Sequence, residues 1–330
     1  MHAQTTVKTT MRQVIFALIP GLIASVWILG WGVIIHCILA VACALIIEQI
    51  MGRIKDHKMR QGIWDESSII TGLLFALSIT PFAPWWVTIT GVCFAMIVAK
   101  HLYGGLGENI FNPAMSGYAF VLICFPLELS HWPALYTHTF TQDILIPWND
   151  MLMLPQNLDS ISGATPLTFN KLQINNMVML SEIPSASLFS LSLNQGWGWL
   201  NLVFLIGGLW LLVKKIIPWQ IPVTIICTLV VLSTITNLYD PERYNPAIFH
   251  VLTGGFLLAV FFIATDPVTS ATTPFGKIIY AVGIGILIYC IRAWGSYSDG
   301  IAFSILIMNA AVPLIDAMTQ PNIFGKKITP

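Results

Sequence analysis

Residues 14–52 read VIFALIPGLIASVWILGWGVIIHCILAVACALIIEQIMG, and this stretch decides the fold. Its two successive apolar runs contain a single carboxylate, Glu48. A helix that spans a membrane needs roughly 20 mostly apolar residues, so each run is long enough. The whole chain has the same character: 56% of its 330 residues are hydrophobic and 9% are charged. Because soluble domains carry about 25% charged residues, the sequence predicts an all-α integral membrane protein.

Apolar runs of this kind recur along the chain, separated by polar turns. We expect about ten transmembrane helices, at residues 14–30, 33–52, 67–80, 84–100, 114–128, 197–213, 217–236, 247–264, 277–292 and 300–317. A long polar loop, residues 129–196, separates the fifth helix from the sixth. The predicted organisation is therefore a first membrane part (1–128), the loop (129–196) and a second membrane part (197–330).

The positions of lysine and arginine predict the orientation, because these residues concentrate in short cytoplasmic segments. With the N-terminus inside, twelve of the fifteen basic residues lie on the cytoplasmic side, and Lys171, Arg243 and Arg292 lie outside. Adding or removing one helix would reverse everything downstream and spoil this separation. We therefore expect both termini in the cytoplasm and the long loop on the outer face.

Two pairs of segments suggest an internal repeat. TGLLFALSITP (71–81) resembles TGGFLLAVFFIATDP (253–267), and HLYGGLGENIF (101–111) resembles RAWGSYSDGIAF (292–303). Each copy would hold five helices, an odd number, so the second copy would cross the membrane upside down. Inverted repeats are typical of proteins that transport across the bilayer. Chance similarity between glycine-rich turns is the other explanation.

Several carboxylates lie within or beside the apolar runs. Glu48 lies close to Arg53, and we expect it to be an ordinary interfacial residue. Glu108, Asp266 and Asp299 each lie in a Gly- or Pro-rich turn between predicted helices. Such carboxylates are candidates for contact with an ion or a cofactor, and a solvated turn is the equal alternative. The six cysteines form no C-x-x-C pair, which argues against an iron–sulfur or zinc site, and we expect them to be small buried hydrophobes.

The heptad Asp159-Ser160-Ile161-Ser162-Gly163-Ala164-Thr165 lies in the middle of the long loop. Taken alone, it is typical of a surface turn, because Asp and Ser bond to nearby backbone and Gly permits a bend. Loops nevertheless carry function more often than the scaffold that positions them. Its small side chains would leave the Thr165 hydroxyl accessible to a modifying enzyme.

Three segments together resemble one family: HLYGGLGENIFNPAMSGYAF, DSISGATPLT and the stretch from ATDPVTS to DAMTQP. They are similar to the D subunits of Rnf complexes, ion-translocating ferredoxin:NAD oxidoreductases of bacterial inner membranes. The family also contains the homologous B subunit of the sodium-pumping NADH:quinone oxidoreductase. The chain has no long N-terminal extension of the kind expected in that B subunit, which favours the Rnf family.

The resemblance implies a covalent FMN. In that family, the motif D-x-x-[S/T]-G-A-[S/T] is where a flavin transferase attaches FMN, through a phosphoester, to the last hydroxyl residue. Here that residue is Thr165, and Asp159, Ser162, Gly163 and Ala164 occupy the other motif positions. Asp159 could help to hold the magnesium ion of the attachment reaction. Thr168 is the competing acceptor, outside the motif.

The resemblance also implies the remaining partners and the overall activity. We expect the A, B, C, E and G subunits of an Rnf complex, the flavin transferase and membrane lipid as partners, and no nucleic acid. A second, non-covalent flavin (riboflavin or FMN) is implied without identified contacts. The expected function is a flavin-carrying subunit that couples electron transfer to ion movement, with Na⁺ or H⁺ left open. A channel or transporter without a redox role, and a purely structural subunit, are the alternatives.

Overall fold

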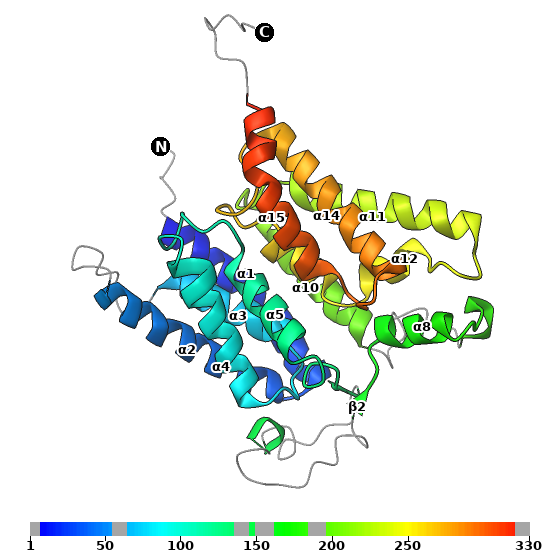
Figure 1. Cartoon of the computed structure of the whole chain (residues 1–330), viewed down its shortest axis with the longest axis horizontal. Helices are drawn as coiled ribbons and strands as arrows, with labels where there is room; N and C mark the ends of the chain where they lie inside the picture. The colour runs from blue at the N-terminus through cyan, green and yellow to red at the C-terminus, as the bar shows by residue number, and fades with distance from the viewer. Residues whose placement is uncertain (1–6, 55–64, 135–144, 149–161, 184–195, 321–330) are drawn as a thin grey trace, which may run out of the picture.

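The computed structural model describes residues 7–54, 65–134, 145–148, 162–183 and 196–320, and helices make up most of it (Figure 1). Helices long and apolar enough to cross a membrane are α1 (Val7–Leu29), α2 (Gly32–Ile54), α11 (Gln220–Tyr239), α14 (Pro274–Trp294) and α15 (Ile301–Met318). Shorter apolar helices are α3 (Glu66–Ser78), α4 (Trp85–Cys93) with its π-helical continuation η2 (Phe94–His101), α5 (Pro113–Cys124) and α10 (Trp197–Val213). The predicted class, an all-α membrane protein with several spans, is confirmed.

The prediction of one continuous helix at 247–264 is wrong. The segment is divided into α12 (Ala247–Leu252), α13 (Phe256–Leu258) and the π-helix η6 (Ala259–Ile263). Helical geometry stops at Thr253, which is extended, and Gly254 has a φ of +66°, which is open mainly to glycine. The sequence Thr-Gly-Gly therefore ends one helix and lets the next begin.

Buried side chains satisfy the backbone groups that this break exposes. The Asn201 amide of α10 donates to the carbonyls of Leu252 (3.0 Å) and Gly254 (2.8 Å) and accepts from the Leu257 N–H (3.2 Å). The Arg292 guanidinium donates to the carbonyl of His250 (2.6 Å). Non-helical backbone within a membrane needs hydrogen-bond partners of this kind. The break is therefore stabilised by specific side chains from other helices.

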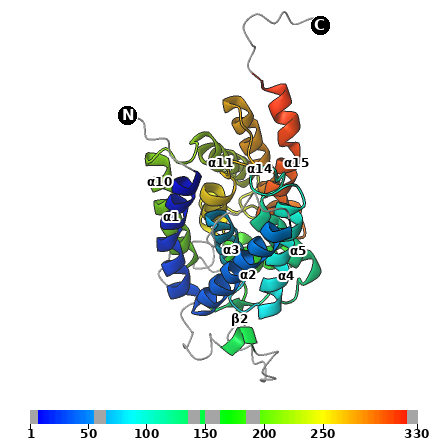
Figure 2. The same ribbon diagram turned by 90° about the vertical axis from the view of Figure 1, so that its left-hand side faces the viewer.

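The two halves of the chain meet where α1 packs against α10 (Figure 2). Glycines allow the close approach: a Cβ at Gly207 would lie 2.3 Å from the carbonyl oxygen of Ala17, and one at Gly21 would lie 2.2 Å from the ring of Phe204. Small residues at helix contacts are typical of membrane bundles, because association there depends on tight packing.

The long loop contains structure that the sequence pattern did not predict. A two-residue antiparallel pairing joins β1 (Trp132–Pro133) to β2 (Ser162–Gly163), and the helix α8 (Pro166–Asn175) follows directly. The 3₁₀ turns η3 (Ile146–Trp148) and η5 (Leu180–Glu182) complete the described part of the loop. In both views, α1 begins and α15 ends at one end of the bundle, whereas β2 lies at the other (Figures 1 and 2).

Candidate functional site

The predicted attachment residue, Thr165, caps a helix. Its side chain accepts a hydrogen bond from the Thr168 N–H (3.2 Å), and the two threonine hydroxyl oxygens are 2.9 Å apart. Pro166 occupies the first position of α8, where its missing N–H costs nothing. Thr165 is half-buried and Ala164 is exposed, so this part of the loop lies at the protein surface.

Local pairing holds the motif in this position. Ser162 pairs with Pro133 and Gly163 with Trp132, which ties the residues before Thr165 to the segment after α5. The pairing therefore fixes where Ser162, Gly163, Ala164 and Thr165 lie relative to the end of α5. Asp159 lies outside the described residues.

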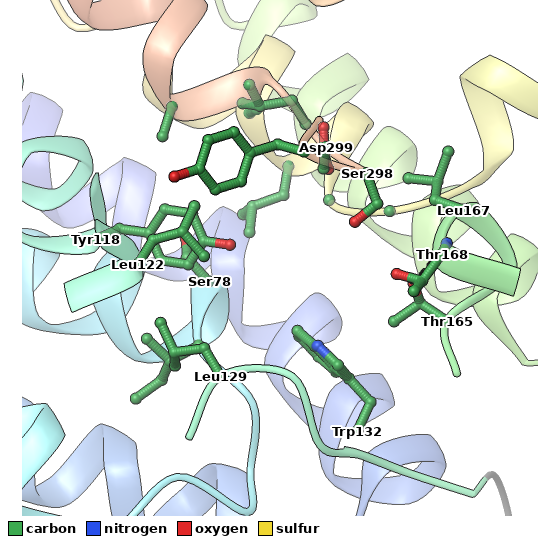
Figure 3. A pocket seen from close by; sticks show the side chains of 18 of the residues that line it. Ser78, Tyr118, Leu122, Leu129, Trp132, Thr165, Leu167, Thr168, Ser298 and Asp299 are labelled. Carbon is green, nitrogen blue, oxygen red and sulfur yellow. Dashed lines mark hydrogen bonds between the residues drawn. The ribbon is translucent and has the colours of Figure 1, made fainter. Parts of the chain in front are cut away.

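Thr165 and Thr168 lie at the edge of a cavity of about 390 Å³, which we call the Thr165 cavity (Figure 3). Its walls come from both halves of the chain: α1, α3 and α5 on one side, α10, the helix break and α15 on the other. Ligand pockets are commonly about 300–1,000 Å³ and mostly apolar with a few polar groups. The size of this cavity falls within that range.

The lining of the Thr165 cavity combines a large apolar wall with polar groups at separate points. Leu122, Leu129 and Trp132 face it from the first half, and Figure 3 shows Trp132 below Thr165 and Tyr118 opposite. Trp132 also packs edge-on against Trp197, with ring centroids 5.4 Å apart. The polar lining includes Ser78, Tyr118, Ser298 and Asp299. A planar ring with polar edges suits such walls, because aromatic side chains stack on it and hydroxyls bond to its rim.

A lysine of α8 connects this helix to the end of α14 and the turn after it. Lys171 Nζ donates to the carbonyl oxygen of Ile291 (3.2 Å), in the last turn of α14, and to that of Tyr297 (2.6 Å), in the turn after the helix. Cations are favourable at a helix C-terminus, where carbonyls lack partners. Partial burial lowers the pKa of Lys171. The contact fixes the position of α8, and of Thr165 at its start, relative to the second half of the chain.

The three turn carboxylates have different surroundings. Glu108 is exposed, as expected of a solvated turn. Asp299 lines the Thr165 cavity and pairs with Arg292 (3.3 Å). Asp266 lines a second, smaller cavity of about 140 Å³, the Asp266 cavity, and accepts from Thr269 Oγ1 (3.1 Å) and Asn112 Nδ2 (3.4 Å).

Glu48, which we expected to be an ordinary interfacial residue, belongs to an ion-paired cluster that the sequence did not predict. Its carboxylate accepts from Lys100 Nζ (2.9 Å) and lies 2.9 Å from His101 Nε2. Lys100 is 1% exposed and also bonds to Asp65 (3.0 Å). Sequence reasoning missed this cluster because Lys100 reads as one more basic residue at a helix end. Its location within the apolar run 84–100 was the available signal.

The expectation that all six cysteines are small buried hydrophobes also fails in part. Cys37 is buried, whereas Cys124 and Cys227 are exposed. Both exposed cysteines lie on apolar helices, α5 and α11. An apolar run in a membrane protein can face lipid as well as the protein interior, so it does not predict burial.

Taken together, the fold and the site define a multi-pass membrane protein whose polar loop presents a helix-capping threonine over a cavity between its two halves. The chain belongs to the NQR2, RnfD, RnfE family, whose sequence profile matches residues 1–325.

Curated relatives align with the chain over nearly its whole length. The chain is 39% identical over 338 residues to the D subunit of the ion-translocating oxidoreductase complex of Aliivibrio salmonicida, an alignment covering 99% of the chain and 96% of the relative. The protein of the same name from Escherichia fergusonii is 40% identical over 339 residues, with the same two coverages. That of Aeromonas salmonicida is 38% identical over 338 residues, covering 99% and 97%.

Proposed function

We propose that this chain is the membrane subunit that carries a covalent flavin in a redox-driven ion-translocating oxidoreductase complex. The full-length relatives are named as the D subunits of such complexes, which supports the assignment to a translocase. The observation that carries the flavin assignment is the position of Thr165, an accessible hydroxyl at the edge of a cavity large enough for a ring system.

The residues around Thr165 fit an attached FMN. A phosphoester at Thr165 Oγ1 would lie at the N-terminus of α8, beside the Thr168 N–H and hydroxyl, and helix N-termini favour phosphate groups. The Thr165 cavity would hold the ring against Trp132, with the hydroxyls of Tyr118 and Ser298 for its polar edge. The flavin would supply the acceptance and release of electrons, while this chain positions it and excludes water.

The membrane arrangement that we propose has ten spans in two inverted halves, both termini in the cytoplasm and Thr165 outside. The two cavities support it. The Thr165 cavity gathers Leu29, Ser78, Leu129 and Ser298, all at predicted outer helix ends. The Asp266 cavity gathers residues at predicted cytoplasmic ends, namely Met11, Ser67, Lys100, Ile216 and Asp266. Most of the segments that line each cavity thus come from one predicted side, which supports the proposal, although Met115 and Ile263, near predicted cytoplasmic ends, also line the Thr165 cavity.

The remaining partners belong to the same proposal. We infer a bacterial inner-membrane location, assembly with the A, B, C, E and G subunits of an Rnf complex, and maturation by a flavin transferase. A second, non-covalent flavin, riboflavin or FMN, is part of the inference from the family.

In-gel flavin fluorescence under denaturing conditions tests the covalent assignment. We expect a fluorescent band and an FMN mass adduct on the peptide containing Thr165 when the chain is made together with a working flavin transferase. The band should be lost in Thr165→Val and retained in Thr168→Val, the matched control. A band that disappears only in Thr168→Val would move the attachment to that residue. An unmodified wild-type chain would overturn the flavin assignment and favour a channel, transporter or structural subunit.

A further inference from the structure

The helix α8, which begins directly after Thr165, is attached to the rest of the molecule by a small number of side chains. No other described helix has more than slight backbone contact with it, and it lies at the edge of the bundle (Figure 1). One of its sides borders the Thr165 cavity. Another borders a hollow of about 470 Å³, formed with the segment between α11 and α12 and the end of α14. Elements with few buried contacts open at a low cost in free energy, so a few bonds decide the position of α8.

Lys171 makes three of these bonds. Its Nζ donates to the carbonyl oxygens of Tyr297 (2.6 Å), Ile291 (3.2 Å) and Arg292 (3.4 Å). Carbonyls in the last turn of a helix have no partner within the helix and favour a cation beside them. All three acceptors are uncharged, and water can replace the ammonium at each of them. The attachment of α8 to the end of α14 is therefore reversible without leaving a charge unpaired in the interior.

Two further side chains connect α8 to the second half of the chain. Leu167 is 7% exposed, and its Cδ1 would lie 2.8 Å from a Cβ at Gly254, which places it against the helix break. Asn170 is 1% exposed and donates to Asn245 Oδ1 (3.3 Å). With Lys171, these contacts all come from one and a half turns of a single short helix. Release of α8 therefore disturbs no contact between the membrane helices.

The attached position of α8 does not suit an enzyme that must enclose Thr165. Thr165 Oγ1 accepts from the Thr168 N–H (3.2 Å) and lies 2.9 Å from Thr168 Oγ1, while the next two residues, Pro166 and Leu167, are buried. In the proposed attachment, Oγ1 forms a bond to the FMN phosphorus of a flavin dinucleotide. The diphosphate bond breaks, the nucleoside monophosphate leaves, and the hydroxyl proton passes to water. Such a displacement needs the attacking oxygen in line with the leaving group, inside the cleft of the transferase.

We propose that Lys171 is a releasable latch on α8. The helix moves away from the end of α14 to present Thr165 to the transferase, and it returns with the flavin attached. On return, the phosphate occupies the N-terminus of α8, where helix N–H groups favour it, and the Lys171 bonds form again. Lys171 touches none of the reacting atoms and is a positioning residue. This inference rests on the proposed flavin at Thr165.

The rate of attachment tests the release of α8. The whole complex is purified from cells without the transferase, and the transferase and a flavin dinucleotide are then added. Because only the released fraction reacts, the initial rate of the fluorescent band in a denaturing gel is proportional to that fraction. Lys171→Met removes a charged donor and should raise the rate roughly tenfold. Lys171→Arg keeps donors for the same carbonyls and should stay close to wild type.

Iodide quenching tests the return of α8. Iodide quenches the fluorescence of a flavin that it can reach, so a ring inside the Thr165 cavity is protected. The modified Lys171→Met complex should be quenched more strongly than the modified wild type. General damage to the fold would slow the attachment as well. Faster attachment together with weaker protection is therefore the result that a purely structural role of Lys171 does not give.

Two other variants and one flavin-independent measurement complete the test. Asn170→Ala removes a different contact of α8 and should change both readouts in the same directions as Lys171→Met. Asn176→Ala removes an exposed side chain just after α8 and should change neither. In the complex without flavin, amide hydrogen exchange in residues 166–175 should be faster in Lys171→Met than in wild type.

The outcomes that overturn the latch differ from those that overturn the flavin. A band that forms at the same rate in wild type and Lys171→Met, or more slowly in the variant, would overturn the latch alone. Equal amide exchange in the two proteins would do the same. A wild-type complex that never acquires the band would overturn the proposed function, and the latch with it.

Discussion

At the scale of single residues, the two groups of ion-paired side chains at the predicted cytoplasmic end differ in how deeply the basic residue is buried. Lys100 is buried among Glu48, Asp65 and two serine hydroxyls, whereas Arg12 is largely exposed and, among the described residues, pairs with the buried Glu66 (3.0 Å). Removing one partner of a pair in which both groups are buried costs about 3–5 kcal/mol, and the cost is smaller where one partner is exposed to solvent, as Arg12 is. We expect Lys100→Met to lower the melting temperature of the detergent-solubilised protein sharply and Arg12→Gln to lower it less. Similar losses in both variants would contradict this interpretation.

The same cluster predicts a pH dependence. Burial works to raise the pKa of Asp65, but the Lys100 ammonium and the Ser68 hydrogen bonds outweigh it, so this pKa is lowered. In the wild type, the stabilisation from ionised Asp65 is present above its unfolded pKa, about 3.9, and is lost as pH falls through the lower folded value.

In Lys100→Met the lowering by the Lys100 ammonium is lost, while burial, the Glu48 charge and the Ser68 hydrogen bonds remain, so the folded pKa of Asp65 should be higher than in the wild type. The cost of the ionised carboxylate in the variant then decreases as pH falls. We therefore expect the gap in melting temperature between wild type and variant to narrow between pH 7 and pH 4. A gap that widens on acidification would exclude this account.

Single-residue chemistry was partly readable from the sequence. Ser162, Gly163, Ala164 and Thr165 form a contiguous motif, so their proximity needs no fold. The partners of Lys100 come from residues 35 and 52 positions away. Only the packing of α2, α3 and η2 brings them together, and no local pattern records it.

At the scale of elements, the break between α12 and α13 contains two adjacent glycines that differ in the space available for a side chain. A Cβ at Gly254 would lie 2.7 Å from Asp299 Oδ2 and 2.8 Å from Leu167 Cδ1, at a φ of +66°. A Cβ at Gly255 would meet nothing within 4 Å. Strained φ values cost about 1–3 kcal/mol. We expect Gly254→Ala to lower the melting temperature and Gly255→Ala to leave it nearly unchanged, and the reverse order would refute the assigned geometry.

The contact between α1 and α10 gives a second matched pair. Gly207→Ala forces a methyl group against the Ala17 carbonyl, and overpacking of this kind costs about 1–3 kcal/mol. A methyl group at Gly52, near the end of α2, would meet no atom of the described residues within 4 Å. Gly52→Ala should be neutral or slightly stabilising, because alanine favours a helix by about 0.5–1 kcal/mol over glycine. Thermal denaturation of both variants measures the difference, and equal effects would argue against the tight contact.

Helices were the most predictable elements, for a physical reason. A long apolar run has one stable state in a bilayer, so α10 begins and ends at the expected residues, Trp197 and Val213. The ends of α1 and α5 differ because polar residues extend one helix and Pro126 follows the other. The break at Gly254 was not predicted, because its exposed backbone is stabilised by Asn201 and Arg292 from distant helices.

At the scale of the whole molecule, the proposed orientation can be measured with two exposed residues. Ala164 and Glu108 are both exposed and lie on opposite sides of the membrane in the proposed arrangement. In a chain without its natural cysteines, Ala164→Cys should react with a membrane-impermeant maleimide in spheroplasts. Glu108→Cys should react only after the membrane is permeabilised. Reaction of both variants in intact spheroplasts would reject the proposed orientation.

The distribution of charge predicted sides, and hydrophobicity predicted spans, because both can be read from the order of residues along the chain without its folded structure. The Thr165 and Asp266 cavities could not be predicted, since each needs the packing of helices far apart in the chain. The Thr165 cavity, for example, requires Leu29 from α1 and Ala302 from α15 at once. Such sites become visible only when the whole bundle is in place.

Because the Thr165 cavity needs segments from both ends of the chain, the order of synthesis limits when the cavity can form. The proposed attachment residue, Thr165, is synthesised when half of the 330-residue chain has been made, but the cavity beside it also needs residues 296–302. A chain whose synthesis stopped before the last helix would expose the Thr165 hydroxyl without a complete cavity to hold an attached flavin. If the flavin is attached only after the last helix has inserted, its ring can enter the complete cavity and is not left exposed to water. Pulse-labelled cells would reveal this order as flavin on full-length chains and none on shorter ones.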